Sequence, residues 1–440
     1  MYHNILIIFL LINSPFVVAK TPVNNFQSEA EAYTMTLKKL TDVMILDITG
    51  PCAVARYYTY ANLLAYEIIY QQDKPSNYAM LYGKLNDYPD FATIEAESPI
   101  DVNFAALYGM LRIGEELLPS GYLLEEALHE LINEASDNNK ARIKVIEASR
   151  NYVNLMVDEM VKYAVRDGYV KTSGYMRYTP LKLPGSWQPT PPGYMEAYEP
   201  HWSKVRPFVL DSAGQIKPKP PIEFSEKENS PFFLLAKEVH DTTLKLSPEQ
   251  KAIAGFWDCN PFFLIQKGHL TFGTKKISPG GHWIGITGIA SVKKGLSLQE
   301  TARWHTLVSL TMSDAFLSCW NEKFNSNRIR PETFINQAID REWVPILQTP
   351  PFPEYTSGHS VVSASVSKVL SRLAGSEFSY VDTVEEEFGL PARLFGSFEE
   401  AAREAAISRF YGGIHFRDAI EHGFEQGERI GDYMINQLDL

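Results

Sequence analysis

The sequence of 440 residues predicts an all-α fold, and two observations carry that prediction. Apolar residues recur at steps of three and four over long stretches, which is the period of a helix with one buried face. Helix-start signals, Ser-Pro and Ser-x-x-Glu, precede several of these stretches. No run of residues shows the two-residue alternation of a half-buried strand. The length suits one large domain or two smaller ones.

The first 19 residues predict a secretory signal peptide rather than part of the fold. Ile5 to Ala19 is almost wholly apolar, and Val17-Val18-Ala19 offers small residues before Lys20. A membrane anchor is the weaker alternative, since the run is shorter than the ~20 residues of a span. We therefore expect a periplasmic or secreted protein, with no membrane span after the signal is removed.

Residues 20–225 predict an N-terminal helical region. One helix covers Pro51 to Gln72, and two long amphipathic helices cover Leu124 to Val165. Between Pro180 and Pro221 lie 10 of the 27 prolines, which forbid helix and favour an extended segment. Its aromatic residues predict that this segment wraps the surface or helps to line the mouth of a pocket.

Residues 226–440 predict a second helical region. Helices begin after Ser230-Pro231 and Ser247-Pro248, and two capping boxes stand at Ser297-x-x-Glu300 and Ser397-x-x-Glu400. The first box opens a helix over 297–324. Further helices are expected over 361–373, over 397–409 with Gly412-Gly413 as its stop, and from His415 to Ile435.

Charge and cysteine usage exclude several classes of function. The net charge of −12 repels nucleic acid and anionic membranes, so no nucleic-acid partner is expected. Cys52, Cys259 and Cys319 are too few and too widely spaced for a disulfide framework or a zinc site, and buried free thiols are expected. The absence of a His-Glu-x-x-His pattern argues against a zinc hydrolase.

The first of three clusters is basic. Lys323 stands near the end of the 297–324 helix, and Arg330-Pro331 follows seven residues on. If the helix continued, both cations would share one face, but 325–327 could also end it. The alternative is a solvated basic patch at a helix C-terminus, where cations are favoured in any case.

The second cluster is Thr356-Ser357-Gly358-His359, directly before the apolar 361–373 run. This places Ser357 and Gly358 at a helix N-terminus, where backbone N–H groups attract an anion. His359 then stands in the first turn, where it can give or take a proton. The alternative is a capping serine beside an incidental histidine.

The third cluster is Ser408-Arg409 followed by His415. Asp418 lies three residues past His415, on the same helix face. Its carboxylate could hold Nδ1–H of the histidine and leave Nε2 free as a ligand or nucleophile. The alternative is a buried structural His–Asp pair.

Together the clusters predict a pocket for a tetrahedral oxyanion. Lys323, Arg330 and Arg409 supply positive charge, and the second cluster supplies neutral donors. His415 would be an axial base and His359 a proton shuttle on the opposite side. Such a set suits a trigonal-bipyramidal phosphate transition state or its stable mimic, vanadate.

The ordered clusters resemble the signature shared by type 2 phosphatidic acid phosphatases and vanadium-dependent haloperoxidases. The resemblance implies an all-α fold of helical bundles around a bound oxyanion, with His415 bonded to vanadium and His359 as the acid–base residue. It implies that the equatorial oxygens are bound by Lys323, Arg330, Ser357, Gly358 and Arg409.

Two positions depart from the family pattern. Thr356 stands where proline is common, and the carboxylate after the third-cluster histidine is commonly four residues on. Here Asp418 is three residues on and Glu421 is six, which leaves the partner of His415 open.

Two aromatic residues indicate which activity within the family is expected, and one carboxylate is a further site candidate. Trp320 and Phe352 resemble aromatics that flank the halide side of the pocket in chloride-oxidising haloperoxidases. The alternative is that both belong to the core. Asp258 is a candidate carboxylate behind an active-site arginine. The membrane phosphatases carry several spans, and none is expected here.

The leading hypothesis is a secreted vanadium-dependent haloperoxidase that oxidises halide with hydrogen peroxide through a His-ligated vanadate cofactor, without haem or flavin. The alternative is a soluble acid phosphatase that hydrolyses a phosphomonoester through a phosphohistidine at His415. A non-enzymatic phosphate- or vanadate-binding protein is the third hypothesis. The halide and the oligomeric state stay open.

Overall fold

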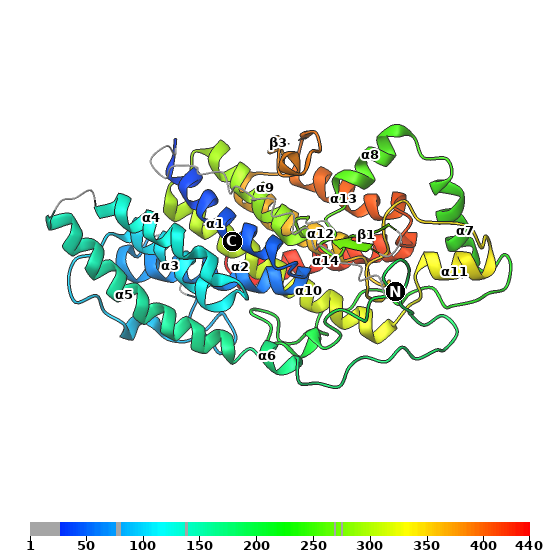
Figure 1. Cartoon of the computed structure of the whole chain (residues 1–440), viewed down its shortest axis with the longest axis horizontal. Coiled ribbons are helices and arrows are strands. Elements are labelled where there is room, and N and C mark those ends of the chain that lie inside the picture. Colours follow the sequence, from blue (N-terminus) through cyan, green and yellow to red (C-terminus); the bar gives the residue numbers. More distant parts are fainter. Residues whose placement is uncertain (1–26, 76–80, 137–139, 268–269, 274–275) are drawn as a thin grey trace, which may run out of the picture.

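The computed structural model describes residues 27–75, 81–136, 140–267, 270–273 and 276–440. The predicted signal peptide lies outside the described residues. The regular secondary structure of the described chain is nearly all helix, as predicted (Figure 1). In order, its elements are α1 (Glu29–Leu46), α2 (Pro51–Asp73), η2 (Phe91–Thr93), α3 (Val102–Leu117), η3 (Gly121–Leu124), α4 (Glu125–Ser136), α5 (Lys140–Val165), α6 (Tyr169–Thr172), η4 (Trp202–Lys204), α7 (Pro231–Thr243), α8 (Pro248–Phe256), β1 (Leu264–Lys267), β2 (Leu270–Gly273), α9 (Pro279–Lys294), α10 (Leu298–Ser326), α11 (Pro331–Ala338), α12 (Gly358–Ala374), β3 (Tyr380–Asp382), η5 (Glu386–Phe388), β4 (Arg393–Phe395), α13 (Phe398–Tyr411) and α14 (Arg417–Gln437).

The predicted helix starts are confirmed by their capping contacts. Ser297 accepts a hydrogen bond from the Glu300 amide at the start of α10, and Ser397 does the same for Glu400 at the start of α13. Ser247 and Gln250 complete a reciprocal box before α8. These caps satisfy amides that have no partner within the helix.

Two short antiparallel hairpins depart from the prediction of no strands. β1 pairs with β2 and β3 pairs with β4, over four and three residue pairs respectively. Segments this short cannot show a clear two-residue alternation in the sequence. Both hairpins lie between helices and leave the all-α class unchanged.

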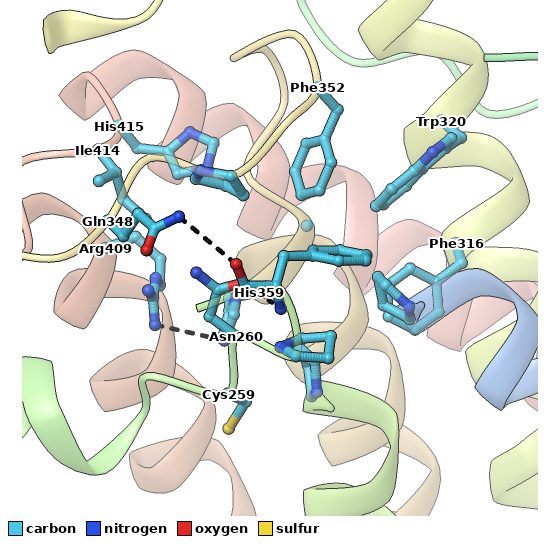
Figure 2. Close-up of a pocket in the computed structure, with 16 residues that line it drawn as sticks. Cys259, Asn260, Phe316, Trp320, Gln348, Phe352, His359, Arg409, Ile414 and His415 are labelled. Atoms are coloured by element: carbon cyan, nitrogen blue, oxygen red, sulfur yellow. Dashed lines mark hydrogen bonds between the residues drawn. The ribbon is translucent and has the colours of Figure 1, made fainter. Parts of the chain in front are cut away.

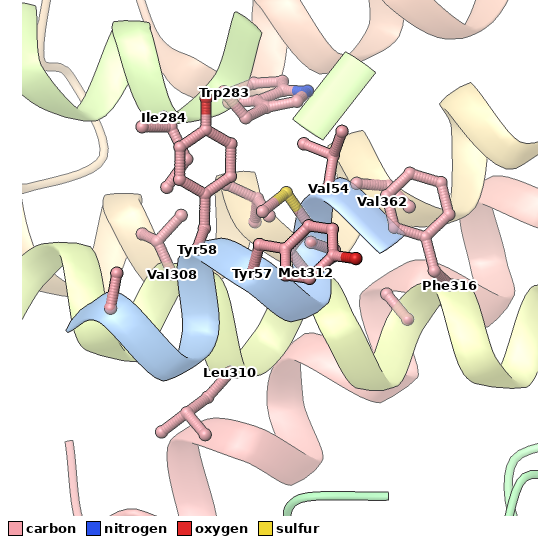
Figure 3. Packing of buried hydrophobic residues seen from close by; sticks show 14 of the residues in the cluster. Val54, Tyr57, Tyr58, Trp283, Ile284, Val308, Leu310, Met312, Phe316 and Val362 are labelled. Atoms are coloured by element: carbon pink, nitrogen blue, oxygen red, sulfur yellow. The ribbon is translucent and has the colours of Figure 1, made fainter. Parts of the chain in front are cut away.

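One hydrophobic core joins residues of both sequence halves (Figure 3). Val54 and Tyr58 of α2 face Val308 and Met312 of α10, and Trp283 of α9 lies beside them. Nearly every residue of α2 from Pro51 to Ile69 is buried, whereas the sequence had indicated one apolar stripe. A helix covered on all sides is a central helix, so α2 and α10 form the axis that positions the site.

The proline-rich segment between α6 and α7 contains one short helical turn, η4. Asp314 of α10 fixes it from the core, since its carboxylate accepts hydrogen bonds from the amides of Phe208, Val209 and Leu210 at 2.7–2.8 Å. Near Tyr198 the segment packs against the pocket wall described below. Among the described residues, no helix is long and apolar enough to cross a membrane.

Candidate active site

The second and third clusters meet at one pocket (Figure 2). His359, Arg409 and His415 line it, and Trp320 and Phe352 form an aromatic wall beside them. The other lining residues are Pro51, Cys259, Asn260, Pro261, Phe262, Pro279, Phe316, Gln348, Pro350, Gly358 and Ile414. The predicted residues Lys323, Arg330 and Ser357 are fully buried and lie behind this lining rather than in it.

Lys323 is held by backbone carbonyl groups. It lies in the last turn of α10, and its Nζ donates to the carbonyl oxygens of Pro353 and Glu354 at 3.1 Å and of Thr356 at 2.5 Å. Burial lowers the pKa of Lys323 to about 8, because the charged form loses its hydration. The ammonium therefore contributes charge close to the second cluster, with its N–H groups already bonded.

Arg330 does not lie on the same helix as Lys323, which was one of the two possibilities left by the sequence. α10 ends at Ser326, because Asn327 adopts a left-handed conformation, and Arg330 is the N-cap of α11. Its Nε donates to the carbonyl of Phe352 at 2.9 Å and its Nη1 to that of Ile414 at 2.8 Å. Burial lowers the pKa of Arg330 to about 9.

The second cluster forms the N-terminus of α12, as predicted. Ser357 is the N-cap, and its Oγ accepts from the amide of Ser360 at 3.3 Å. The amides of Gly358 and His359 are therefore the open first-turn donors. A Cβ added to Gly358 would meet only the Trp320 ring, at 3.7 Å, so the space beside this glycine is pocket.

His359 and Arg409 share one backbone acceptor. The carbonyl oxygen of Trp257 accepts from His359 Nε2 at 3.1 Å and from Arg409 Nη1. Arg409 Nη1 also lies 3.4 Å from His359 Nε2, and the shorter contact to a carbonyl, which can only accept, favours the tautomer with the proton on Nε2 and a lone pair on Nδ1. Burial first, then the charge of Arg409, holds the pKa of His359 well below its usual value.

Asp258 lies behind Arg409, as the sequence suggested. Its Oδ1 is 3.6 Å from Arg409 Nη2, and its Oδ2 pairs with Lys276 Nζ at 2.5 Å. The two oxygens of the Asp258 carboxylate thus contact two different cations. The carboxylate orients Arg409 without cancelling its charge entirely, and burial lowers the pKa of Arg409.

The partner of His415, which the sequence left open, is Glu354 and not the candidate Asp418. Nδ1 of His415 is bonded to Glu354 Oε1 at 2.8 Å, and the same oxygen accepts from the amide of Phe416 at 2.9 Å. Asp418 instead forms a bidentate ion pair with Arg328, at 2.6 and 2.7 Å. α14 begins at Arg417, so His415 precedes the helix and the same-face spacing to Asp418 does not apply.

This environment keeps His415 neutral with a defined tautomer. A carboxylate accepts only, so Nδ1 carries the proton and Nε2 presents its lone pair. Nε2 lies 3.2 Å from Arg330 Nη1, at the pocket. Burial, followed by the charges of Arg330 and Lys323, holds the pKa of His415 well below its usual value.

The site therefore carries positive charge without a matching anion. Lys323 and Arg330 are fully buried, and their hydrogen bonds go to backbone carbonyls and, from Arg330, to the His415 ring, all of which are neutral. Nη2 of Arg330 and Nε of Arg409 are buried and lack a protein partner. Unpaired buried donors on cations are costly, so a group that supplies negative charge and acceptor oxygens fits here. A tetrahedral oxyanion is such a group.

The aromatic wall is a packed unit. The ring centroids of Trp320 and Phe352 are 4.8 Å apart, and both side chains are buried. The indole N–H of Trp320 donates to the carbonyl of Tyr198 at 3.4 Å, and the Tyr198 ring lies 4.5 Å from that of Phe262. The proline-rich segment thus supports the wall from behind, and none of the described residues that line the pocket comes from it.

Sequence reasoning missed Glu354 and Arg328. Glu354 is fully buried, and its Oε2 accepts from Arg328 Nε at 2.6 Å, so this carboxylate joins His415 to the Arg328–Asp418 pair. A signal was present: an acidic residue within Pro351-Phe352-Pro353-Glu354-Tyr355 is surrounded by apolar residues and requires a partner.

Comparison with known proteins identifies the family and the fold of the chain. A family model described as the VCPO second helical-bundle domain matches residues 303–439. No curated protein matches the chain. Solved structures of a bacterial vanadium-dependent chloroperoxidase share the fold at 16% identity, in the holo form (TM-score 0.65, 89% of this chain and 93% of that chain) and in the apo form (TM-score 0.68, 89% and 95%).

A solved bacterial vanadium-dependent iodoperoxidase is far more similar. It shares 42% identity with a TM-score of 0.85, and the match covers 92% of this chain and 95% of that chain. At that identity, over nearly the whole length of both proteins, the chain belongs to the vanadium-dependent haloperoxidases.

Proposed function

We propose that the pocket binds vanadate and that the enzyme uses hydrogen peroxide to oxidise iodide. The observation that carries the vanadate assignment is the buried charge of Lys323 and Arg330, which have no paired carboxylate among the described residues, beside Arg409, whose charge Asp258 offsets only in part. Nη2 of Arg330 and Nε of Arg409 also lack an acceptor in the described chain. A bound oxyanion would supply both the charge and the acceptors.

The residues divide into holding and proton-transfer roles. Nε2 of His415 would be the ligand to vanadium, since Glu354 fixes the proton on Nδ1. The cations and the first-turn amides of α12 hold the oxygens. Bound vanadate supplies a Lewis acid that activates peroxide without a change in its own oxidation state.

His359 is placed to accept and return a proton at Nδ1. Its depressed pKa keeps it neutral, so it is available as a base near neutral pH. The hydrogen bond from Nε2 to the Trp257 carbonyl holds the ring in place. Apolar residues on the Trp320 side keep water from the halide and strengthen the electrostatic interactions of the pocket.

Iodide is proposed because the solved relative at 42% identity is an iodoperoxidase. The chloroperoxidases at 16% identity share the fold and support no halide assignment. The resemblance of Trp320 and Phe352 to aromatics of chloride-oxidising enzymes supports the alternative of chloride. Rates measured with iodide, bromide and chloride on one preparation decide between them.

The experiment is reconstitution. Vanadium-free protein is assayed with each halide and peroxide before and after orthovanadate is added, and with p-nitrophenyl phosphate in parallel. We expect halide oxidation that depends on vanadate and is inhibited by phosphate. Activity that depends on haem, or phosphatase activity with no halide oxidation, would contradict the proposal.

We also propose that the enzyme acts in the periplasm or outside the cell. The apolar run from Ile5 to Ala19 supports this location. N-terminal sequencing of protein purified from its natural host tests it. We expect the mature protein to begin after Ala19, and a protein that still begins at Met1 would refute the proposal.

A further inference from the structure

A second buried cluster lies beside the pocket, outside the anion-binding residues. Nδ1 of His282, in the first turn of α9, is 3.4 Å from Cys259 Sγ and 3.0 Å from Glu385 Oε1. The sulfur and that carboxylate oxygen are 3.6 Å apart. All three side chains are buried. Among the described residues, no other trio of His, Cys, Asp and Glu has ligand atoms this close together.

The cysteine spacing argued against a zinc site made by the cysteines themselves, but here one thiol meets a histidine and a glutamate from other parts of the chain. We propose that Cys259, His282 and Glu385 bind a divalent transition-metal ion, with zinc as the best match. These three interatomic distances define a triangle whose circumradius is about 1.9 Å. Zinc takes nitrogen and oxygen at about 2.0–2.1 Å and sulfur at about 2.3 Å, so an ion slightly above this plane reaches all three atoms. Tetrahedral ligands at those lengths are about 3.3–3.6 Å apart, close to the observed separations.

The other nitrogen of His282 is already oriented as in known metal sites. Nε2 is 2.7 Å from Asp382 Oδ2, while Oδ1 of this aspartate accepts from the amide of Val384 at 3.0 Å. A carboxylate that holds one imidazole N–H directs the second nitrogen to the ion. Asp382 therefore selects the tautomer in which Nδ1 is the ligand.

Charge also favours an ion at this position. Two buried carboxylates, Glu385 and Asp382, face one histidine. A divalent ion that displaces one proton from the Cys259 thiol and one from the His282 imidazolium leaves the net charge of the cluster unchanged. Binding thus adds no unbalanced charge to the interior, and the thiolate is a ligand that zinc prefers.

The ion would fix the segment that orients the catalytic groups. The ring of Trp257 stacks on that of His282 with centroids 4.5 Å apart, and its carbonyl holds His359 and Arg409. Asp258 lies between Trp257 and Cys259 in the chain and pairs with Arg409. A metal bonded to Cys259 and His282 would anchor both ends of this short segment. The ligands are positioning residues, and the site is independent of the vanadate assignment.

Cobalt titration tests the site without vanadate, peroxide or halide. Chelator-treated full-length protein is titrated with Co²⁺, and tetrahedral cobalt with one thiolate gives a charge-transfer band together with intense visible bands. We expect one ion per chain, displaced by Zn²⁺. Cys259→Ser should remove the charge-transfer band, whereas Cys319→Ser, which alters another buried thiol, should keep it.

Two further variants keep the test decisive if Cys259→Ser does not fold. Glu385→Gln removes a ligand charge, and Asp382→Asn removes the carboxylate that orients His282. Each should weaken the ion's Kd about 10–100-fold. Failure of Co²⁺ and Zn²⁺ to bind stoichiometrically, or a charge-transfer band that survives in Cys259→Ser, would overturn the proposal and leave a hydrogen-bonded imidazolium between two carboxylates.

Discussion

Replacing Glu354 with glutamine tests whether this carboxylate sets the tautomer of His415. Glutamine keeps the shape of the side chain and loses its charge. Glu354 Oε1 accepts from His415 Nδ1 at 2.8 Å and from the Phe416 amide at 2.9 Å, and Oε2 accepts from Arg328 at 2.6 Å. Without the carboxylate, the proton of His415 is no longer fixed on Nδ1, and Nε2 is a poorer ligand.

The magnitude follows from the loss of a charged acceptor that orients a metal ligand. Such changes weaken metal affinity about 10–100-fold, or about 1.4–2.7 kcal/mol. The fold should lose a similar amount, about 1–3 kcal/mol for a lost charge-assisted hydrogen bond, since Arg328 keeps its bidentate pair with Asp418. Vanadate affinity is measured by equilibrium dialysis, and stability by urea denaturation of the vanadate-free protein.

Asp418→Asn is the matched control. It also weakens the contacts of Arg328, but Asp418 has no hydrogen bond to His415. We expect a comparable loss of stability with vanadate affinity close to that of the parent. Equal losses of affinity in both variants, or parental affinity in Glu354→Gln, would refute the reasoning about the tautomer.

Three further outcomes are expected. His359→Ala should retain vanadate and lose about 10²–10⁴ in turnover, as dialysis and steady-state rates on the same samples would show; loss of vanadate itself would make His359 a binding residue. Phe352→His should slow the oxidation of chloride most, then bromide, then iodide, because water enters beside the pocket. An equal loss for all halides with a lower melting temperature would identify Phe352 as a residue of core packing. A parent enzyme that oxidises only iodide would refute the expected effect on chloride. His305 is fully buried without a hydrogen-bond partner, and burial lowers its pKa to about 3. Between about pH 6.5 and 3 the unfolded chain therefore binds a proton at this histidine that the folded chain does not, so the free energy of unfolding falls as pH falls, by about 2 kcal/mol from this group at pH 5. His305→Phe should remove that loss, as urea melts at pH 5 and 7.5 would show. An unchanged pH dependence of stability would contradict the prediction.

Helices were predictable from the sequence where periodicity and caps agree. Ser297 and Ser397 accept from the amides three residues on, and α12 begins at Gly358 as its glycine and serine indicated. The hairpins were not predictable, because strands of three or four residues carry too little pattern. The division into regions 20–225 and 226–440 stays a prediction.

The site was predictable as a set of residue types and less so as a set of contacts. Convergence of Arg409, His359 and His415 on one pocket followed from the order of the motifs. The pairing of His415 with Glu354 did not, because 61 residues separate them and only the tertiary fold brings them together. Local spacing favoured Asp418, but that rule holds only inside a helix, and His415 precedes α14.

The cations of the pocket are held largely by main-chain oxygens, and this has a consequence for variation among relatives. Lys323, Arg330 and Arg409 donate to the carbonyls of Trp257, Phe352, Pro353, Glu354, Thr356 and Ile414. Every amino acid supplies a carbonyl, so side-chain replacement at most of these positions leaves the acceptor in place. An alanine scan would therefore overlook these carbonyl groups, although it would report on the side chains of Glu354 and Phe352. We therefore expect relatives to keep the backbone conformation at these positions, while the side chains that serve only as carriers of a carbonyl vary.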